Sequence, residues 1–223
     1  MRRMLPGLIA LAAAMAFGLW ALPRLPAEVV SHWGIDGKAD GSSSRNTIVF
    51  LIPLAGLAVA LLFAVFPRID PRRANYELHA GTYWTLANAT LIAFAAMHAL
   101  VIGINLGWPV SINRAMGIGV GGFFILIGNL LTRIRPNWFM GIRTPWTLSS
   151  DSVWRKTHRI GGYAFVIAGV ILIAMGFARP AWLMMTLFGA AMLAGLVPVV
   201  YSYILWREEQ RAKASASRPV SSP

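Results

Sequence analysis

The side chains best suited to recognition lie in one basic, Trp-rich segment, which reads PNWFMGIRTPWTLSSDSVWRKTHRIGG from Pro136 to Gly162. Arg143 stands in the sequence Gly-Ile-Arg-Thr-Pro-Trp, where the neighbouring Pro and Trp can hold its side chain rigidly. A guanidinium held in this way can bind a carboxylate or a phosphate through two hydrogen bonds. The competing interpretation is an Arg that extends to lipid phosphates. The segment therefore predicts a recognition site, with Arg143 as its first candidate.

The second half of this segment predicts a short basic helix. Ser149 or Ser150 can cap its first turn, where Asp151 favours the helix dipole. We expect the helix to run from about Ser150 to Arg159 along the inner membrane interface, with its Trp residues in the headgroup region. Its basic turn either faces water and anionic lipid or binds a partner. The candidate partner-binding residues here are Asn129, Asn137, Trp138, Gly141, Arg143, Thr144, Pro145, Trp146, Trp154, Lys156, His158 and Arg159.

A second polar segment, residues 23–46, contains His and Asp, which are metal-ligand types. A calcium loop that starts at Asp36 would need an acidic residue at its twelfth position, where Thr47 stands. Its Asp-Gly pairs are turn signals. We therefore expect a loop with one extended piece around Glu28–His32, continued as loop through Ser42–Ser44, and no metal site. Facing outward, it would meet an extracellular peptide through His32, Trp33, Gly34, Asp36, Gly37 and Asp40.

Long apolar runs separate these polar segments. Of the 223 residues, 57% are hydrophobic and only 13% are charged, whereas soluble domains carry about 25% charged residues. A helix needs about 20 residues to cross the hydrocarbon core of a membrane, and the short alternating strands of a membrane barrel do not appear. The sequence predicts an all-α polytopic membrane helix bundle with about six spans, approximately Met4–Leu22, Thr47–Phe66, Gly81–Leu106, Ala115–Leu131, Gly162–Ala178 and Ala181–Trp206.

The basic residues are distributed unevenly between the connections. Of the 20 Lys and Arg residues, 15 lie in the N-terminus, the second and fourth loops and the C-terminal tail. By the positive-inside rule, this distribution places the N- and C-termini in the cytoplasm. It also explains the net charge of +12 without direct nucleic-acid binding. The chain has no Cys, which excludes disulfides and thiolate metal sites.

We expect three parts along the chain. Residues 1–110 form an N-terminal membrane domain, and residues 111–206 form a second membrane domain with the signature segment (residues 132–161) in its cytoplasmic loop. The tail, residues 207–223, has too few apolar residues to fold. Similar Pro- and Trp-containing patterns follow the first span of each half, which indicates either an inverted three-helix repeat or chance. Small residues predict close helix packing at Gly117 and Gly121, and at Ala191 and Gly195.

Two polar side chains lie at or inside the predicted spans. His98 is the only ionisable group well inside one, and such groups are functional candidates in membranes. A neutral His that bonds to a neighbouring helix is the alternative. Asn129, near the inner end of the fourth span, predicts a structural hydrogen bond to backbone or to a neighbouring helix.

Two motifs resemble a known family. The sequence GN-x-L from Gly128, followed by PNWFMGIRTPWTL and VWRKTHRIGG, is similar to the signature of the SdpI-type immunity proteins. The pattern LP-x-x-x-x-x-HWG-x-DGKADG from Leu25 to Gly41 resembles the uncharacterised membrane domain often fused before that signature. The resemblance implies a multi-pass protein of the bacterial inner membrane that protects against a secreted antimicrobial peptide toxin. It also implies a relay in which a cytoplasmic repressor is held at the membrane.

Other functions compete with immunity. A transporter or exporter is the main alternative, although all eight acidic residues lie outside the predicted spans and only His98 could carry protons within them. A structural subunit of a membrane complex stays open. We find no catalytic constellation and no cofactor motif, so we do not expect an enzyme.

Overall fold

The computed structural model describes residues 2–178 and 181–216. Its long helices confirm the six predicted spans, and each contains a stretch apolar enough to cross a membrane. They are α1 (Leu5–Ala21), α2 (Arg45–Ile69), α4 (Ala80–Asn105), α5 (Ile112–Leu131), α7 (Asp151–Phe177) and α8 (Ala181–Ala216). Shorter elements lie between them, namely η1 (Arg2–Met4), η2 (Leu22–Arg24), β1 (Glu28–Trp33), β2 (Ala39–Ser44), α3 (Asn75–Leu78) and α6 (Pro145–Ser149).

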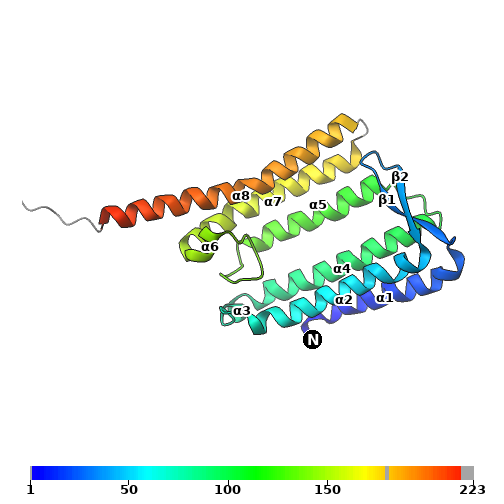
Figure 1. Ribbon diagram of the computed structural model, residues 1–223, viewed down its shortest axis with the longest axis horizontal. Helices are drawn as coiled ribbons and strands as arrows, with labels where there is room; N and C mark the ends of the chain where they lie inside the picture. Colours follow the sequence, from blue (N-terminus) through cyan, green and yellow to red (C-terminus); the bar gives the residue numbers. More distant parts are fainter. Residues whose placement is uncertain (1, 179–180, 217–223) are drawn as a thin grey trace, which may run out of the picture.

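The long helices form two groups of three (Figure 1). In the first group, α1, α2 and α4 contact one another in pairs, whereas in the second α5 packs on α7 and α7 packs on α8. Between the two groups, α4 contacts α5. The strands lie at one end of the bundle, which we term the hairpin end, and α3 and α6 lie at the other, the loop end (Figure 1).

The second group is held together by glycines. A Cβ atom added at Gly121 would lie 2.5 Å from the carbonyl oxygen of Gly169, and one at Gly128 would lie 2.6 Å from that of Gly162. The two backbones are therefore in direct contact, which is the use of small residues at helix interfaces in lipid. This confirms close packing at Gly117 and Gly121. A Cβ atom added at Gly195 would meet nothing within 4 Å, so packing at that glycine was predicted wrongly.

Residues 28–44, in the loop predicted to face outward, form a hairpin, which corrects the prediction that Ser42–Ser44 continue as loop. β2 pairs antiparallel with β1, with Ser44 opposite Glu28 and Ala39 opposite Trp33. Serines have little preference for strands. They form a strand here because β1, which is itself fixed to the bundle, provides an edge with which they can pair. Asn105, the last residue of α4, donates to the carbonyl oxygen of Val30 and accepts from its N–H, at 2.9 and 2.8 Å.

Two helices are longer than expected. The predicted interfacial helix Ser150–Arg159 is instead the beginning of α7, which continues without a break to Phe177. Its cap was predicted correctly, since the Ser150 hydroxyl accepts from the N–H of Val153. The tail is helical as far as Ala216, so the prediction that it is disordered is wrong for residues 207–216. Residues 217–223 lie outside the described residues.

Candidate functional site

The signature segment folds around one buried amide. The side chain of Asn137 is fully buried, and its nitrogen donates to the carbonyl oxygens of Arg135 and Met140 at 2.9 and 3.1 Å. Its oxygen accepts from the N–H groups of Phe139 and Met140 at 3.0 and 2.7 Å. A segment without regular structure must satisfy its buried backbone groups by such means. Asn137 is therefore an organiser of the loop, and not a group exposed to a partner.

A carboxylate from the α2–α4 connection (residues 70–79) also stabilises the conformation of this loop. Asp70 is buried, and its Oδ2 accepts from the Tyr76 hydroxyl and from the N–H of Trp138, both at 2.9 Å. Its Oδ1 accepts from the N–H of Arg72 at 2.7 Å. Burial, and then the hydrogen bond to Asp70, raise the pKa of Tyr76 well above its ordinary value. Our sequence interpretation missed Asp70, although an acidic residue between two Arg-containing stretches and directly before Pro was a signal for it.

Two further contacts join the α2–α4 connection to the signature segment. Arg72 forms an ion pair with Asp151 at 2.8 Å and donates to the carbonyl oxygen of Leu148 at 3.1 Å. The Asn75 amide donates to the carbonyl oxygen of Pro136 at 2.7 Å. These residues are more than 60 positions apart in sequence. The loop end is therefore one connected polar structure that joins the two helix groups.

Trp154 and His158 are buried, which corrects the prediction that they face the headgroups and water. The Trp154 indole donates to the carbonyl oxygen of Ile134 at 2.9 Å, and its ring stacks on His158 at 4.1 Å. His158 Nε2 accepts from the N–H of Ile142 at 3.0 Å, and Nδ1 lies 2.8 Å from the Trp154 carbonyl oxygen. The imidazole is thus a neutral ring whose Nδ1 donates. Helical periodicity did not predict this burial, because the two rings face the loop of the signature segment and not the lipid.

Gly141 allows the loop to pass over His158. Its φ is +104°, and a Cβ atom there would lie 2.4 Å from His158 Nε2. Thr144 caps α6 in a reciprocal pair with Thr147. The Thr144 hydroxyl also lies 3.0 Å from that of Ser202 on α8. Pro145, the first residue of α6, and Trp146, which packs against Tyr203, complete this contact.

Arg143 is the candidate that combines exposure with a fixed position. Its Nη1 donates to the carbonyl oxygen of Trp138 at 2.9 Å, and the residue is exposed. Trp138 is 49% exposed, and Lys156 and Arg159 also face outward from α7. Asn129 lies away from the loop and donates to the carbonyl oxygen of Ile125 in its own helix. Its expected bond to backbone is confirmed.

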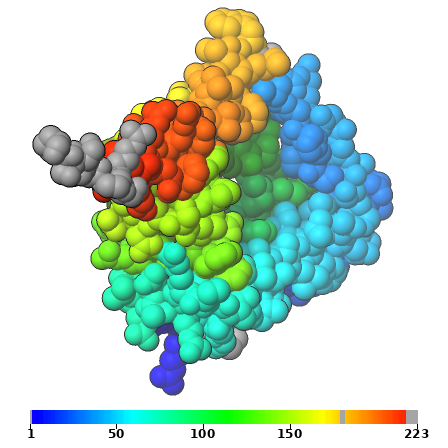
Figure 2. Space-filling view, turned by 60° about the vertical axis from the view of Figure 1, so that its left-hand side comes forward, coloured from blue at the N-terminus to red at the C-terminus, as the bar shows by residue number. Residues whose placement is uncertain are grey.

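An apolar cavity of about 310 Å³ lies beneath Arg143, between the two helix groups. Phe63 and Phe66 of α2 line it from the first group, and Phe165 of α7 lines it from the second. Phe139 of the signature segment borders it and stacks on Phe66 at 4.4 Å. The space-filling view shows a hollow between the cyan face of α2 and the α7–α8 side (Figure 2). The signature segment therefore covers an apolar space with an exposed guanidinium at its edge.

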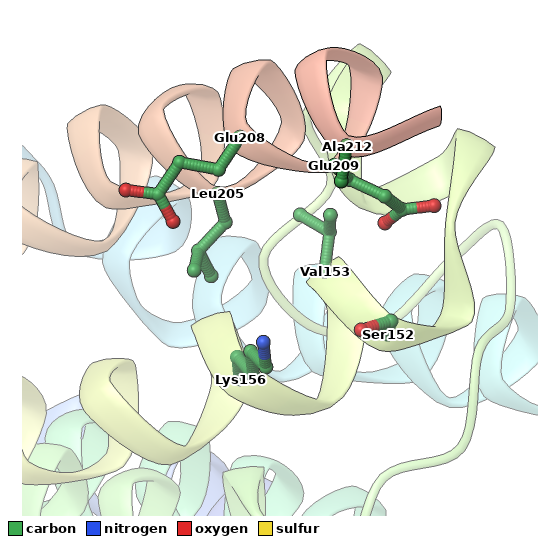
Figure 3. A pocket seen from close by; sticks show the side chains of 7 residues that line it. All are labelled: Ser152, Val153, Lys156, Leu205, Glu208, Glu209 and Ala212. Atoms are coloured by element: carbon green, nitrogen blue, oxygen red, sulfur yellow. The ribbon is translucent and has the colours of Figure 1, made fainter. Parts of the chain in front are cut away.

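A smaller cavity of about 250 Å³ lies between the start of α7 and the end of α8 (Figure 3). Lys156 and Ser152 border it from α7, and Glu208 and Glu209 border it from α8. The Ser150 hydroxyl donates to Glu209 at 2.7 Å, so the end of α8 is fastened to the signature segment. This fastening explains why residues 207–216 are helical despite their polar composition.

The candidate residues of the first loop lie at the hairpin end, opposite the signature segment. His32 Nδ1 lies 2.5 Å from Asp40 Oδ1. The N–H of Lys38, through its hydrogen bond, lowers the pKa of Asp36. Trp33 and Gly34 complete the turn region, and Gly37 has a φ of +79°. Within residues 2–178 and 181–216, no group of three or more His, Cys, Asp or Glu side chains is arranged to hold a metal.

The remaining buried histidines have no described hydrogen-bond partners. His98 is fully buried against Gly18, and neither of its ring nitrogens is hydrogen-bonded within the described part of the chain. The expected bond from His98 to a neighbouring helix was therefore predicted wrongly. His79, at the start of α4, is also buried, and burial lowers its pKa.

Comparison with known proteins finds matches in both halves of the chain. Residues 133–202 match the model of the SdpI/YfhL protein family, and residues 9–57 match a domain of unknown function, DUF1648. The chain is 27% identical over 184 residues to the Immunity protein SdpI of Bacillus subtilis (strain 168), an alignment that covers 82% of this chain and 86% of that protein. No solved structure matches it. The predicted resemblance is confirmed: in this multi-pass protein of the bacterial inner membrane, a region similar to the SdpI/YfhL family follows a region similar to DUF1648.

Proposed function

We propose that this protein protects its cell against a secreted antimicrobial peptide by binding, without chemistry. The observation that carries the proposal is the apolar cavity between the helix groups, covered by the signature segment and bordered by Arg143. A membrane-active peptide offers apolar side chains and a terminal carboxylate. Apolar walls with one convergent charged group suit such a ligand. The two helix groups would be the two membrane domains, residues 1–110 and 111–206.

A survival assay tests this proposal. The protein is expressed in a toxin-sensitive bacterium, its membrane level is measured, and the cells are exposed to the Sdp-type peptide toxin. We expect wild type to protect and Arg143→Ala to lose at least about tenfold in protective concentration, because a charge-assisted contact is worth about 1.5–3 kcal/mol. Arg143→Lys keeps the positive charge but lacks the planar guanidinium, and we expect its protection to lie between that of wild type and that of Arg143→Ala.

Arg73→Ala is the matched control. Arg73 is an exposed Arg at the same end of the molecule, and it does not border the cavity. Full protection by Arg143→Ala at equal expression would reject the site. Failure of wild type itself at good expression would reject protection against this toxin.

We also propose that the loop end faces the cytoplasm. Both α1 and α8 reach that end, and it carries most of the basic residues (Figure 1). Because the chain has no Cys, single cysteines report on sidedness without background. We expect a membrane-impermeant maleimide to label Ser43→Cys on whole cells, and Ser152→Cys only after permeabilisation. Labelling of Ser152→Cys on intact cells would reverse the topology.

A cytoplasmic repressor is a finer proposal for the same end. The end of α8 and the start of α7 carry both signs of charge around the smaller cavity, through Lys156, Glu208 and Glu209. That surface is fastened to the signature segment through Ser150. A conformational change of the signature segment on toxin binding would thus be transmitted directly to the surface around the smaller cavity. Co-purification of a repressor with wild type that survives Glu208→Lys would exclude this surface as the contact.

A further inference from the structure

A third cavity, of about 490 Å³, lies on the other side of the signature segment, away from the apolar cavity under Arg143. Arg133 and Arg135 border it from the residues that follow α5, and Arg155 borders it from the second turn of α7. Thr132 contributes a hydroxyl at its edge. Three exposed Arg residues, each with forked N–H donors, therefore line one space.

The three guanidiniums lack a balancing carboxylate. Asp151 also lines the cavity, but its Oδ1 is already paired with Arg72 at 2.8 Å. Within the described residues, no Asp or Glu lies within ion-pair distance of Arg133, Arg135 or Arg155. Like charges around one cavity repel one another. An anion in the cavity would remove that repulsion and accept from several donors at once.

The neighbouring His does not add to this charge. His158 borders the cavity, yet its Nε2 accepts from the N–H of Ile142 and its Nδ1 donates to Trp154. The ring therefore fixes the wall of the cavity and stays neutral. The recognition chemistry is that of guanidinium with an oxyanion, and a phosphate group matches the Arg fork.

We propose that this cavity binds a phosphate ester, and that the ester is the headgroup of an anionic phospholipid. The cavity lies where α5 ends and α7 begins, which is the depth at which lipid phosphates meet helix ends. Leu78 lines the cavity and is 69% exposed, which gives an apolar neighbour suited to an acyl chain. A soluble phosphate shares the recognition chemistry, and the test separates the two sources.

Native mass spectrometry of the purified protein in nonionic detergent provides the test. We expect wild type to retain phosphatidylglycerol in preference to phosphatidylcholine. Arg133→Gln with Arg155→Gln should weaken phosphatidylglycerol binding by at least about tenfold, because two charge-assisted contacts are lost. The control is Arg73→Gln with Arg159→Gln, which removes the same charge from equally exposed Arg residues that do not border the cavity. We expect the control to stay within about twofold of wild type.

The outcomes distinguish site, source and nonspecific charge. Displacement of the lipid by glycerol 3-phosphate, or binding of inorganic phosphate that the first pair of substitutions removes, would assign the site to a soluble phosphate ester. Equal weakening by both pairs would overturn the proposal, because net charge alone would then explain binding. Absence of any preference for phosphatidylglycerol, with no phosphate binding, would overturn it too. A thermal unfolding curve for each variant excludes loss of fold as the cause.

Discussion

Gly141→Ala should strongly destabilise the signature segment. The backbone at Gly141 has a φ of +104°, which costs a residue with a side chain about 1–3 kcal/mol. The new Cβ would also lie 2.4 Å from Nε2 of the buried His158. The imidazole is fixed by two hydrogen bonds and by stacking on Trp154, so it cannot move aside cheaply.

Thermal unfolding in detergent, followed by tryptophan fluorescence, measures this effect. Gly107→Ala is the matched control, because Gly107 has a φ of +87° but nothing within 4 Å of its Cβ position. We expect Gly107→Ala to lower the unfolding temperature through the backbone alone, and Gly141→Ala to lower it clearly further. Equal shifts for the two variants would show that His158 yields to the methyl group without cost.

Asp70→Ala should have the second large effect. It leaves the N–H of Trp138 without an acceptor and the Tyr76 hydroxyl with only its longer hydrogen bond, 3.5 Å, to Asn137 Oδ1. A buried donor left unpaired costs about 1–3 kcal/mol. The N–H of Arg72 loses its partner as well. We expect a loss of about 3 kcal/mol in the free energy of unfolding, together with loss of protection, because the α2–α4 connection then no longer supports the loop.

Unfolding in a graded mixture of mild detergent and dodecyl sulfate measures the loss. Tyr76→Phe removes only one of the donors and should cost less than Asp70→Ala. Asp36→Ala at the hairpin end removes an exposed carboxylate, and we expect a change below about 0.5 kcal/mol. If Asp70→Ala matched Asp36→Ala, the buried network would carry no stability.

The spans could be predicted because lipid imposes a length and a composition on every helix that crosses it. The glycine contact of α5 with α7 followed from spacing alone at Gly117 and Gly121. The short helix over Ser150–Arg159 was wrong because a basic turn was taken as a surface feature. Its Trp154 and His158 instead face a loop that sequence periodicity does not describe.

The part of the site that escaped prediction depends on contacts between distant segments. Asp70 forms a hydrogen bond with a residue that is 68 positions away in the sequence, and Arg72 with one that is 79 positions away. No local sequence pattern predicts either partner. Asn137 was a candidate for binding, but its side-chain amide is hydrogen-bonded to backbone groups of its own loop. Arg143 was predicted as the recognition residue, and its role stays a prediction. The inverted repeat also stays a prediction, although the two helix groups differ in which of their helices touch.

The two ends of the molecule join the helix groups by different means. At the loop end, an ion pair and partly buried hydrogen bonds join the α2–α4 connection to the signature segment. At the hairpin end, the described hydrogen bond between the groups is that of the Asn113 amide with the carbonyl oxygen of Ile35. The chain itself also crosses between the groups at this end, through residues 106–111 between α4 and α5. We therefore expect this covalent connection and the polar contacts of the loop end to hold the two helix groups together at both ends.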